Sequence, residues 1–230
     1  MRSLRRFIGS KWLSVVLAAI AGLCGWTIVV ASELVPAVGI KSKYRAIAYD
    51  LSTGAVVSYF FYLLVVQLPE AVKRRRVARW LTAHYETFKL ACIEIYLSAI
   101  GDSWESDLPR TLLQAEQFSS YFSEWHSPDQ TRWHAVHNGL YDYGLPQLII
   151  ECELFAREID FTLTKLDLED DQLALFLKRL SRALVRLRTS TPNYDDIKAL
   201  LNFLYPIHSH WSLLDGEVGE DPVANAIARM

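Results

Sequence analysis

The sequence predicts an all-α protein, with an N-terminal two-helix transmembrane hairpin in residues 1–69 and a cytosolic helical bundle in residues 70–230. Two charge-free stretches predict the hairpin: residues 12–32 hold 21 consecutive uncharged positions, and residues 51–69 hold 19. Either stretch can cross a hydrocarbon layer about 30 Å thick at about 1.5 Å of rise per residue. Recurring helix start and stop signals, without convincing strand alternation, predict the bundle.

Composition and charge agree with this division. Hydrophobic residues make up 51% of the 230 residues and charged residues 22%, which is apolar for a soluble protein. Residues 1–69 hold seven basic and two acidic side chains, whereas residues 70–230 hold 17 and 24. The acidic excess argues against bulk attraction of nucleic acid to the C-terminal part, although a local basic stripe can still bind it.

The first apolar segment, residues 12–31, follows a basic start. Two interpretations compete for it. A signal peptide would place Val29 and Ala31 at the small-residue positions before a cut at Ser32. The apolar stretch is longer than the ~7–15 residues of a signal-peptide core, which favours an uncleaved transmembrane helix.

The second span is expected at about residues 51–68, with Asp50 capping its start and Pro69 ending it. Basic residues follow directly and serve as membrane anchors: Lys73, Arg74, Arg75, Arg76 and Arg79. Because basic residues prefer the cytoplasmic side, both termini and the large domain are expected in the cytoplasm. The prediction is a multi-pass protein of the bacterial inner membrane with a short outer loop at residues 32–50.

Small residues recur at helical spacing in both spans. They are Ala18, Gly22, Gly25, Gly54 and Ser58. Such positions let helix backbones approach closely in lipid. They can serve packing within one hairpin or association of hairpins into a homo-oligomer, and both interpretations stay open.

In the C-terminal part, a helix after Pro69 should run to Ile100 and stop at Gly101. Pro206 should split the last helical region, and the tail after Asp215 should fray. Further helices are expected over residues 109–125, from a capping box at residues 127–130, over residues 146–165, after the acidic run 169–171 and from residues 191–192.

One segment of this domain carries an apolar seam with a spacing of 4,3,4,3. Its members are Leu173, Leu177, Leu180, Leu184 and Leu187, with Leu166 seven residues earlier. The spacing predicts either the core of a helical bundle or a coiled coil between subunits.

The same segment is basic. Its basic residues are Lys178, Arg179, Arg182, Arg186 and Arg188. Lys178, Arg182 and Arg186 follow one another at a spacing of four residues, so they share one face of the predicted helix, with Arg179 beside them. They can bind phosphates of nucleic acid or an acidic protein partner, or pair with acids of their own domain.

Candidate chemistry is sparse. Neither a cofactor nor a metal is predicted: the three cysteines form no CxxC, and His134 and His137 lack an assured third ligand. Arg132-x4-His137 resembles the catalytic motif of HEPN ribonucleases, all-helical enzymes that use such an Arg and His at a dimer cleft. Trp133 follows the arginine where that family usually has a polar residue. The leading expectation is a protein that is not an enzyme.

The second span also resembles one that recurs in uncharacterised bacterial inner-membrane proteins. The resemblance covers about 20 of the 230 residues and implies no activity. It rests on Asp50-Leu51-Ser52, Gly54, Ser58-Tyr59-Phe60-Phe61-Tyr62-Leu63-Leu64-Val65-Val66 and Pro69-Glu70.

The whole layout resembles two-transmembrane effectors of bacterial anti-phage systems, such as those encoded beside retron reverse transcriptases. This resemblance implies an effector that permeabilises the membrane when a protein or nucleoprotein partner acts on its cytosolic domain. The alternatives are a membrane-anchored scaffold that recruits a cytosolic partner and, less favoured, a HEPN-like ribonuclease.

Overall fold

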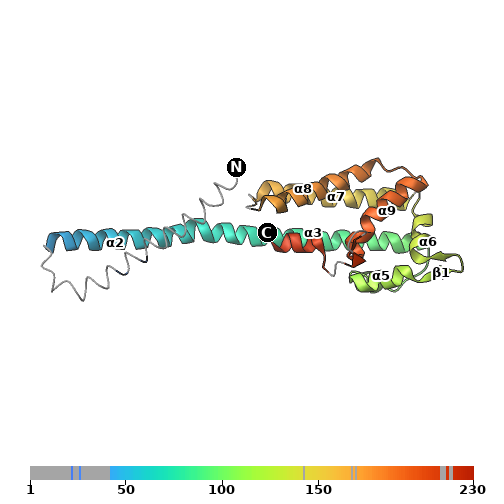
Figure 1. Ribbon diagram of the computed structural model, residues 1–230, viewed down its shortest axis with the longest axis horizontal. Helices are drawn as coiled ribbons and strands as arrows, with labels where there is room; N and C mark the ends of the chain where they lie inside the picture. The colour runs from blue at the N-terminus through green and yellow to red at the C-terminus, as the bar shows by residue number, and fades with distance from the viewer. Residues whose placement is uncertain are drawn as a thin grey trace. The chain divides into compact units, whose positions relative to one another are not determined.

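The computed structural model describes residues 22, 26, 42–141, 143–166, 168, 170–212, 216–217 and 220–230. Across them the chain is mostly helical, which confirms the all-α class (Figure 1). The chain divides into two compact units, Met1–Arg74 and Arg75–Met230. The first predicted span lies outside the described residues except for Gly22 and Trp26, which are both helical and exposed.

The first unit contains α2 (Ser42–Tyr62), a π-helical segment η2 (Leu63–Gln67) and the start of α3 (Leu68–Ile100). The prediction that Asp50 caps the second span is wrong, because Asp50 lies inside α2 with an exposed side chain. No glycine or proline between residues 42 and 53 stops a helix, so α2 begins nine residues before the expected start of the span.

The prediction that Pro69 ends the span is also wrong, because the helix continues through it. A proline ring clashes with the carbonyl four residues earlier and supplies no N–H. The wider π turn directly before Pro69 accommodates this: the N–H of Leu68 donates to the carbonyl of Leu63, five residues back. A proline therefore distorts this helix locally without ending it.

In the second unit, α3 carries the central core stripe. Buried side chains recur from Leu81 through Tyr85, Phe88 and Cys92 to Tyr96, a spacing that keeps them on one helix face. The helix stops as predicted, because Gly101 takes the left-handed conformation at φ 83° that glycine adopts without strain.

Short helices and two small strand pairs follow α3. In chain order they are α4 (Leu108–Thr111), α5 (Ala115–Ser123), β1 (Trp125–Ser127), β2 (Gln130–Thr131), α6 (Arg132–Gly139), α7 (Gly144–Lys165), α8 (Asp171–Arg186), the 3-10 turn η3 (Leu187–Thr189), α9 (Tyr194–Ser209), β3 (Trp211–Ser212), β4 (Gly216–Glu217) and α10 (Pro222–Ala228). The strands of each pair run antiparallel.

Several local predictions are confirmed. The helix expected over residues 146–165 is α7, which begins two residues earlier, at Gly144, and ends at Lys165 as expected. Asp170 caps α8, accepting the N–H groups of Gln172 and Leu173. The leucine seam of α8 lies in the bundle core: Leu173, Leu177 and Leu184 are buried, and α8 packs along α7.

Other local predictions are wrong. The expected helix over residues 109–125 is split into α4 and α5. The predicted capping box at residues 127–130 is the turn of the β1–β2 hairpin, and the cap of α6 is Thr131, whose hydroxyl accepts the N–H of His134 at 3.4 Å. A local signal for a helix start is here outcompeted by strand pairing.

The C-terminal predictions also need correction. Pro206 lies inside α9 and does not split it. The carbonyl that loses its N–H partner belongs to Asn202, an exposed residue where water can take the partner's place. The tail does not fray at its end, because α10 buries Val223, Ala226 and Ile227 against the core.

Candidate functional site

One helical stretch, Thr53–Ile100, is long and apolar enough to cross a membrane by length and composition. The large apolar side chains in the first-unit part of this stretch are exposed, and Val65 is 65% exposed. Leu51, which lies just before the stretch, is 75% exposed. Exposed large apolar side chains that recur along a helix are typical of surfaces that contact lipid or another protein.

Only some of the predicted packing residues lie among the described residues. Gly54 and Ser58 are exposed on α2, and a Cβ added at Gly54 or at Gly22 would meet no atom within 4 Å. Ala18 and Gly25 lie outside the described residues. The described small residues therefore leave open surface on their helices for another helix to contact.

The predicted anchoring residues lie on α3. Arg74 is the half-buried one and pairs with Glu70 at 3.1 Å. Lys73, Arg75, Arg76 and Arg79 are exposed. Among the described residues, no acidic side chain forms an ion pair with these four. The buried stripe of the second unit begins two residues after Arg79, at Leu81.

The structure separates the basic residues of α8 and η3 into two groups. Lys178 Nζ lies 2.8 Å from Oδ1 of Asp160, and Arg188 Nε lies 3.1 Å from Oε1 of Glu153, so both pair with α7. The other three, Arg179, Arg182 and Arg186, are exposed and have no acidic partner among the described residues. Sequence spacing alone did not distinguish the two groups.

The histidines are dispersed. His134 is exposed, with Nδ1 3.2 Å from the hydroxyl of Thr131. His137 is only 8% exposed and packs against the Tyr194 ring at 4.4 Å between centroids. Burial lowers the pKa of His137. No group of three His, Cys, Asp or Glu side chains among the described residues could hold a metal ion.

His208 belongs to the aromatic core. Its ring stacks on Phe118 at 5.0 Å and meets Tyr96 edge-on at 5.5 Å. Neither ring nitrogen has a hydrogen-bond partner among the described residues. Burial lowers the pKa of His208 to about 3, so the ring is neutral near pH 7 and packs as an apolar group.

The two cysteines of the second unit, Cys92 and Cys152, are free and buried. Burial raises the pKa of the Cys92 thiol and raises that of Cys152 to about 12. Neither is therefore an activated thiolate near pH 7.

Arg132 and His137, the pair that resembles a ribonuclease motif, face different surroundings. The Arg132 guanidinium pairs with Glu124 and lies 4.1 Å from the centre of the Tyr121 ring. His137 packs instead against Tyr194, on α9. The structure does not bring the two side chains to one site within this chain.

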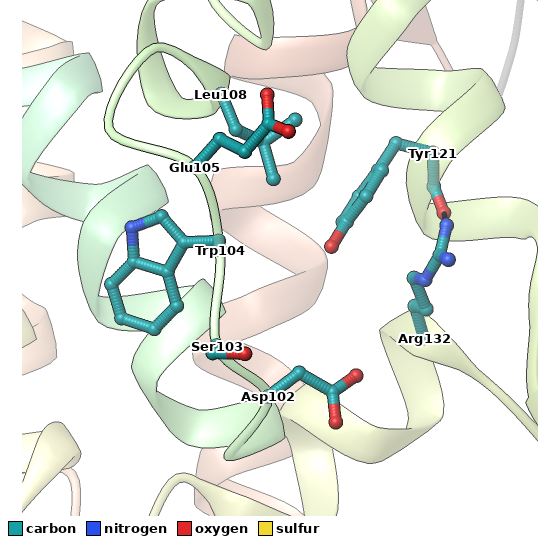
Figure 2. A pocket seen from close by; sticks show the side chains of 7 residues that line it. All are labelled: Asp102, Ser103, Trp104, Glu105, Leu108, Tyr121 and Arg132. Carbon is teal, nitrogen blue, oxygen red and sulfur yellow. Dashed lines mark hydrogen bonds between the residues drawn. The ribbon is translucent and has the colours of Figure 1, made fainter.

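Arg132 lines a cavity of about 400 Å³ beside the loop that follows α3 (Figure 2). Its lining residues are Asp102, Ser103, Trp104, Glu105, Leu108, Tyr121 and Arg132. Figure 2 shows the Tyr121 hydroxyl directed toward the loop, and the Trp104 ring on the other side of that loop. The lining is polar and largely exposed, and its arginine is already neutralised by Glu124. Neither the Ser103 nor the Tyr121 hydroxyl is hydrogen-bonded to a carboxylate among the described residues.

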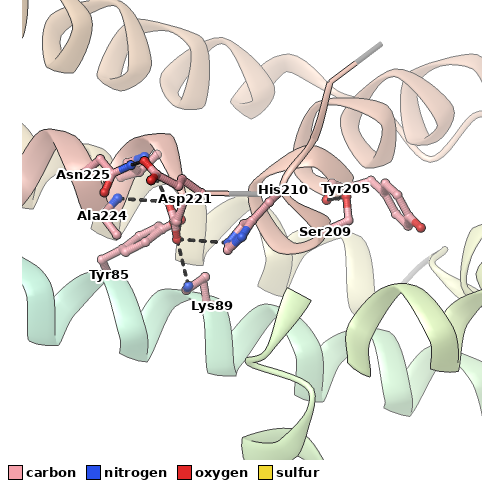
Figure 3. A network of polar contacts seen from close by, with 10 residues as sticks. Tyr85, Lys89, Tyr205, Ser209, His210, Asp221, Ala224 and Asn225 are labelled. Carbon is pink, nitrogen blue, oxygen red and sulfur yellow. Dashed lines mark hydrogen bonds and ion pairs between the residues drawn. The ribbon is translucent and has the colours of Figure 1, made fainter. Parts of the chain in front are cut away.

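A buried polar network that the sequence analysis missed joins α3 to α10 (Figure 3). The Asp221 carboxylate accepts hydrogen bonds from Tyr85 Oη at 2.9 Å and Lys89 Nζ at 3.0 Å, and from the N–H groups of Val223 and Ala224. His210 Nε2 lies 3.4 Å from the same carboxylate. The sequence did carry a signal, since Asp221 precedes a proline at the first helical position.

Burial alone would raise the pKa of Asp221, but the Ala224 N–H and the Lys89 ammonium hold it below its ordinary value. The carboxylate is therefore charged and saturated with donors near pH 7. Such an arrangement fastens the C-terminal helix and leaves no lone pair for a substrate.

No family model, curated protein or solved structure matches this chain.

Proposed function

We propose that this chain is a bacterial inner-membrane effector without enzymatic activity. In this proposal residues 12–31 and 51–68 form a transmembrane hairpin with both termini in the cytoplasm. A partner acts on the helical domain, and the hairpins of several copies associate and permeabilise the membrane. The resemblance in layout to two-transmembrane effectors suggests anti-phage defence as the setting.

The observation that carries the proposal is the exposed apolar surface running from α2 into η2. Its large side chains include Phe60, Phe61 and Leu64, each more than half exposed. In water each such side chain would forgo about 1.5–3 kcal/mol of burial, whereas a bilayer satisfies all of them. The backbone needs no partner from outside, because helical bonds satisfy it.

The charges that follow support the orientation. Four exposed basic side chains of α3, at residues 73, 75, 76 and 79, have no acidic partner among the described residues. Next to anionic headgroups each would contribute about 1 kcal/mol. Basic side chains there favour a cytoplasmic location for this end of the span and for the domain that follows.

The small residues of the spans support association. The surface around Gly54 and Ser58 is open, and a two-helix hairpin by itself leaves most of its faces to lipid. Close approach of a second hairpin there would give van der Waals contact that lipid chains do not match.

The test is induction of the full chain in bacteria while a membrane-potential dye and a dye-entry probe are followed. The control is residues 70–230, which lack both predicted spans. We expect potential loss with the full chain alone. An intact potential in cells that insert the full chain would contradict permeabilisation by the chain itself.

A scaffold that recruits a cytosolic partner is the second candidate. It is favoured by one observation: Arg179, Arg182 and Arg186 of α8, which pair with no acidic side chain among the described residues, form a charged surface distant in sequence from the spans. A scaffold would bind its partner at the membrane while the potential stays intact. Growth arrest by residues 70–230 with an intact potential would instead favour a ribonuclease, and His137→Ala would then test it.

A further inference from the structure

Three arginines of α8 form one outward ridge. At 100° per residue, Arg179, Arg182 and Arg186 fall within a narrow arc, on the side of the helix opposite buried Leu177 and Leu184. All three are exposed. The seam that holds α8 in the bundle therefore directs this ridge away from the core.

The ridge is not needed to pair charges within the domain. The two other basic residues of the segment, Lys178 and Arg188, already pair with Asp160 and Glu153 of α7. No acidic residue occurs between residues 172 and 194, so α8 has no internal partner for the ridge beyond its first turn. Arg179, Arg182 and Arg186 make no ion pair with any described residue.

This arrangement weakens α8. Like charges three and four residues apart destabilise a helix by about 0.2–0.5 kcal/mol per pair. The ridge contains two such pairs, Arg179 with Arg182 and Arg182 with Arg186. Because the domain has an acidic excess elsewhere, bulk solubility does not require them either. An external anionic group bound along the ridge would offset this cost.

Apolar side chains flank the ridge. Leu175, Phe176 and Val185 are 44%, 37% and 47% exposed, respectively. Exposed aliphatic and aromatic groups beside arginines suit a protein surface, which supplies both carboxylates and apolar contacts. A nucleic-acid backbone supplies the charge without an apolar partner for Leu175 and Val185.

We propose that the α8 ridge is the docking site for an acidic α-helical segment of a partner protein. Along α8 the three arginines are separated by about 4.5 and 6 Å, from a rise of about 1.5 Å per residue. Carboxylates three and four residues apart on a partner helix have the same separations. Arginine pairs with carboxylate in a bidentate manner, which gives the contact specificity. This inference deepens the proposed function by giving the partner its chemistry.

The test uses the full chain in nanodiscs of zwitterionic lipid and a fluorescent alanine-rich helical peptide. The peptide has three glutamates at the matching spacing and one leucine on either side, and its comparator has glutamines instead. We expect the glutamate peptide to bind at least about tenfold more tightly, a difference of about 1.4 kcal/mol. Equal binding of the two peptides would overturn the proposal.

Charge reversal gives the second readout. The triple variant Arg179→Glu, Arg182→Glu, Arg186→Glu should lose binding of the glutamate peptide and gain binding of a lysine version. The matched control is Arg110→Glu, Lys165→Glu, Lys198→Glu, which makes the same charge change at exposed sites outside the ridge and should still bind. Equal loss in both variants would show nonspecific attraction and overturn the site.

Two further arms decide the class of partner. Binding of a single-stranded oligonucleotide and of anionic lipid vesicles is measured with the same variants. If the binding of either one depends on the ridge more strongly than the binding of the glutamate peptide does, that class of ligand replaces the protein partner. Failure here is separate from failure of the proposed function. If the membrane potential is lost but the peptide does not bind, only the proposal of an acidic partner is contradicted. If the peptide binds but the potential stays intact, only the proposal of permeabilisation is contradicted.

Discussion

The Nζ atom of Lys89 lies 3.0 Å from Oδ2 of Asp221, and the two side chains are only 12% and 9% exposed. This buried ion pair joins α3 to the N-cap residue of α10, across 132 positions of sequence. Because the same carboxylate also accepts the Tyr85 hydroxyl, the C-terminal helix is fastened at one point to the longest helix of the domain.

Removal of this carboxylate should destabilise the domain strongly. Asp221→Ala leaves the Lys89 ammonium buried without its partner and removes the cap of α10, so we expect a loss of about 3–5 kcal/mol in the free energy of unfolding. Guanidinium unfolding of the full chain in detergent, followed by near-UV circular dichroism, measures it. Glu220→Ala, which removes an exposed partner of Asn225, should change stability by under about 0.5 kcal/mol. Similar losses in both variants would contradict a special role for Asp221.

Stability should begin to fall near pH 6.5 on acidification, because His208 is buried in its neutral form. Folded His208 has a pKa of about 3, whereas the unfolded residue takes up its proton near 6.5. The unfolded state therefore binds more protons between these values, and stability present above about pH 6.5 is lost at about 1.4 kcal/mol per pH unit as the pH falls toward 3. Thermal unfolding midpoints of the wild type and of His208→Phe check this.

The variant should show a shallower fall over the upper part of that window, since phenylalanine keeps the stacking on Phe118 and carries no proton. The contribution of Asp221 has a lower window. Its folded pKa is depressed, so its stabilisation is lost only as the pH falls below the ordinary value of 3.8. Identical pH dependence in both proteins would contradict the buried, neutral assignment of His208.

Gly139→Ala should disturb the contact between α6 and α3. A Cβ at this position would lie 1.9 Å from the backbone carbonyl oxygen of Ala99, so one of the backbones must shift. We expect a loss of about 1–3 kcal/mol. Gly144→Ala is the control, because its nearest contact at 2.9 Å is the movable Leu140 side chain. Unfolding midpoints that rank the two variants in the opposite order would contradict the close approach.

Gly54→Leu, or the corresponding change at Gly22, should abolish potential loss without preventing membrane insertion. A Cβ added at either position would meet no atom of the described residues within 4 Å beyond its own stretch of helix, so we expect the monomer fold to tolerate the change. The larger residue would separate helices that approach closely in an oligomer. Potential loss and in-membrane crosslinking are measured beside the control Val56→Leu. Undiminished potential loss in both glycine variants would argue against association through this surface.

Much of the local structure could be predicted. Gly101 ends α3, α8 begins at the acidic run of residues 169–171 and the leucine seam lies in the core, because each signal acts through neighbours in the same helix. The predictions that Pro69 and Pro206 interrupt their helices are wrong. A π turn before Pro69, and solvent at the carbonyl that Pro206 leaves without an N–H donor, compensate for the hydrogen bond that each proline cannot make. Such compensation depends on the surroundings of the proline and is not visible in its local sequence.

For the candidate sites, the sequence identified the basic cluster after the second span and the basic face of α8. It did not separate Lys178, which pairs with Asp160, from Arg182, which has no ion pair among the described residues. That separation depends on how α8 lies on α7. The role of Asp221 was missed for the same reason, because its partners come from a distant helix.

The sequence by itself determined the helical class, the apolar stretches and the order of charge along the chain. These follow from composition and from a helical period that acts over a few residues. Tertiary structure alone decided which charges are neutralised, which histidine is held neutral in the core and how the C-terminal helix is fastened. Those outcomes depend on burial and on partners up to 136 positions apart, and chain packing is what sets both.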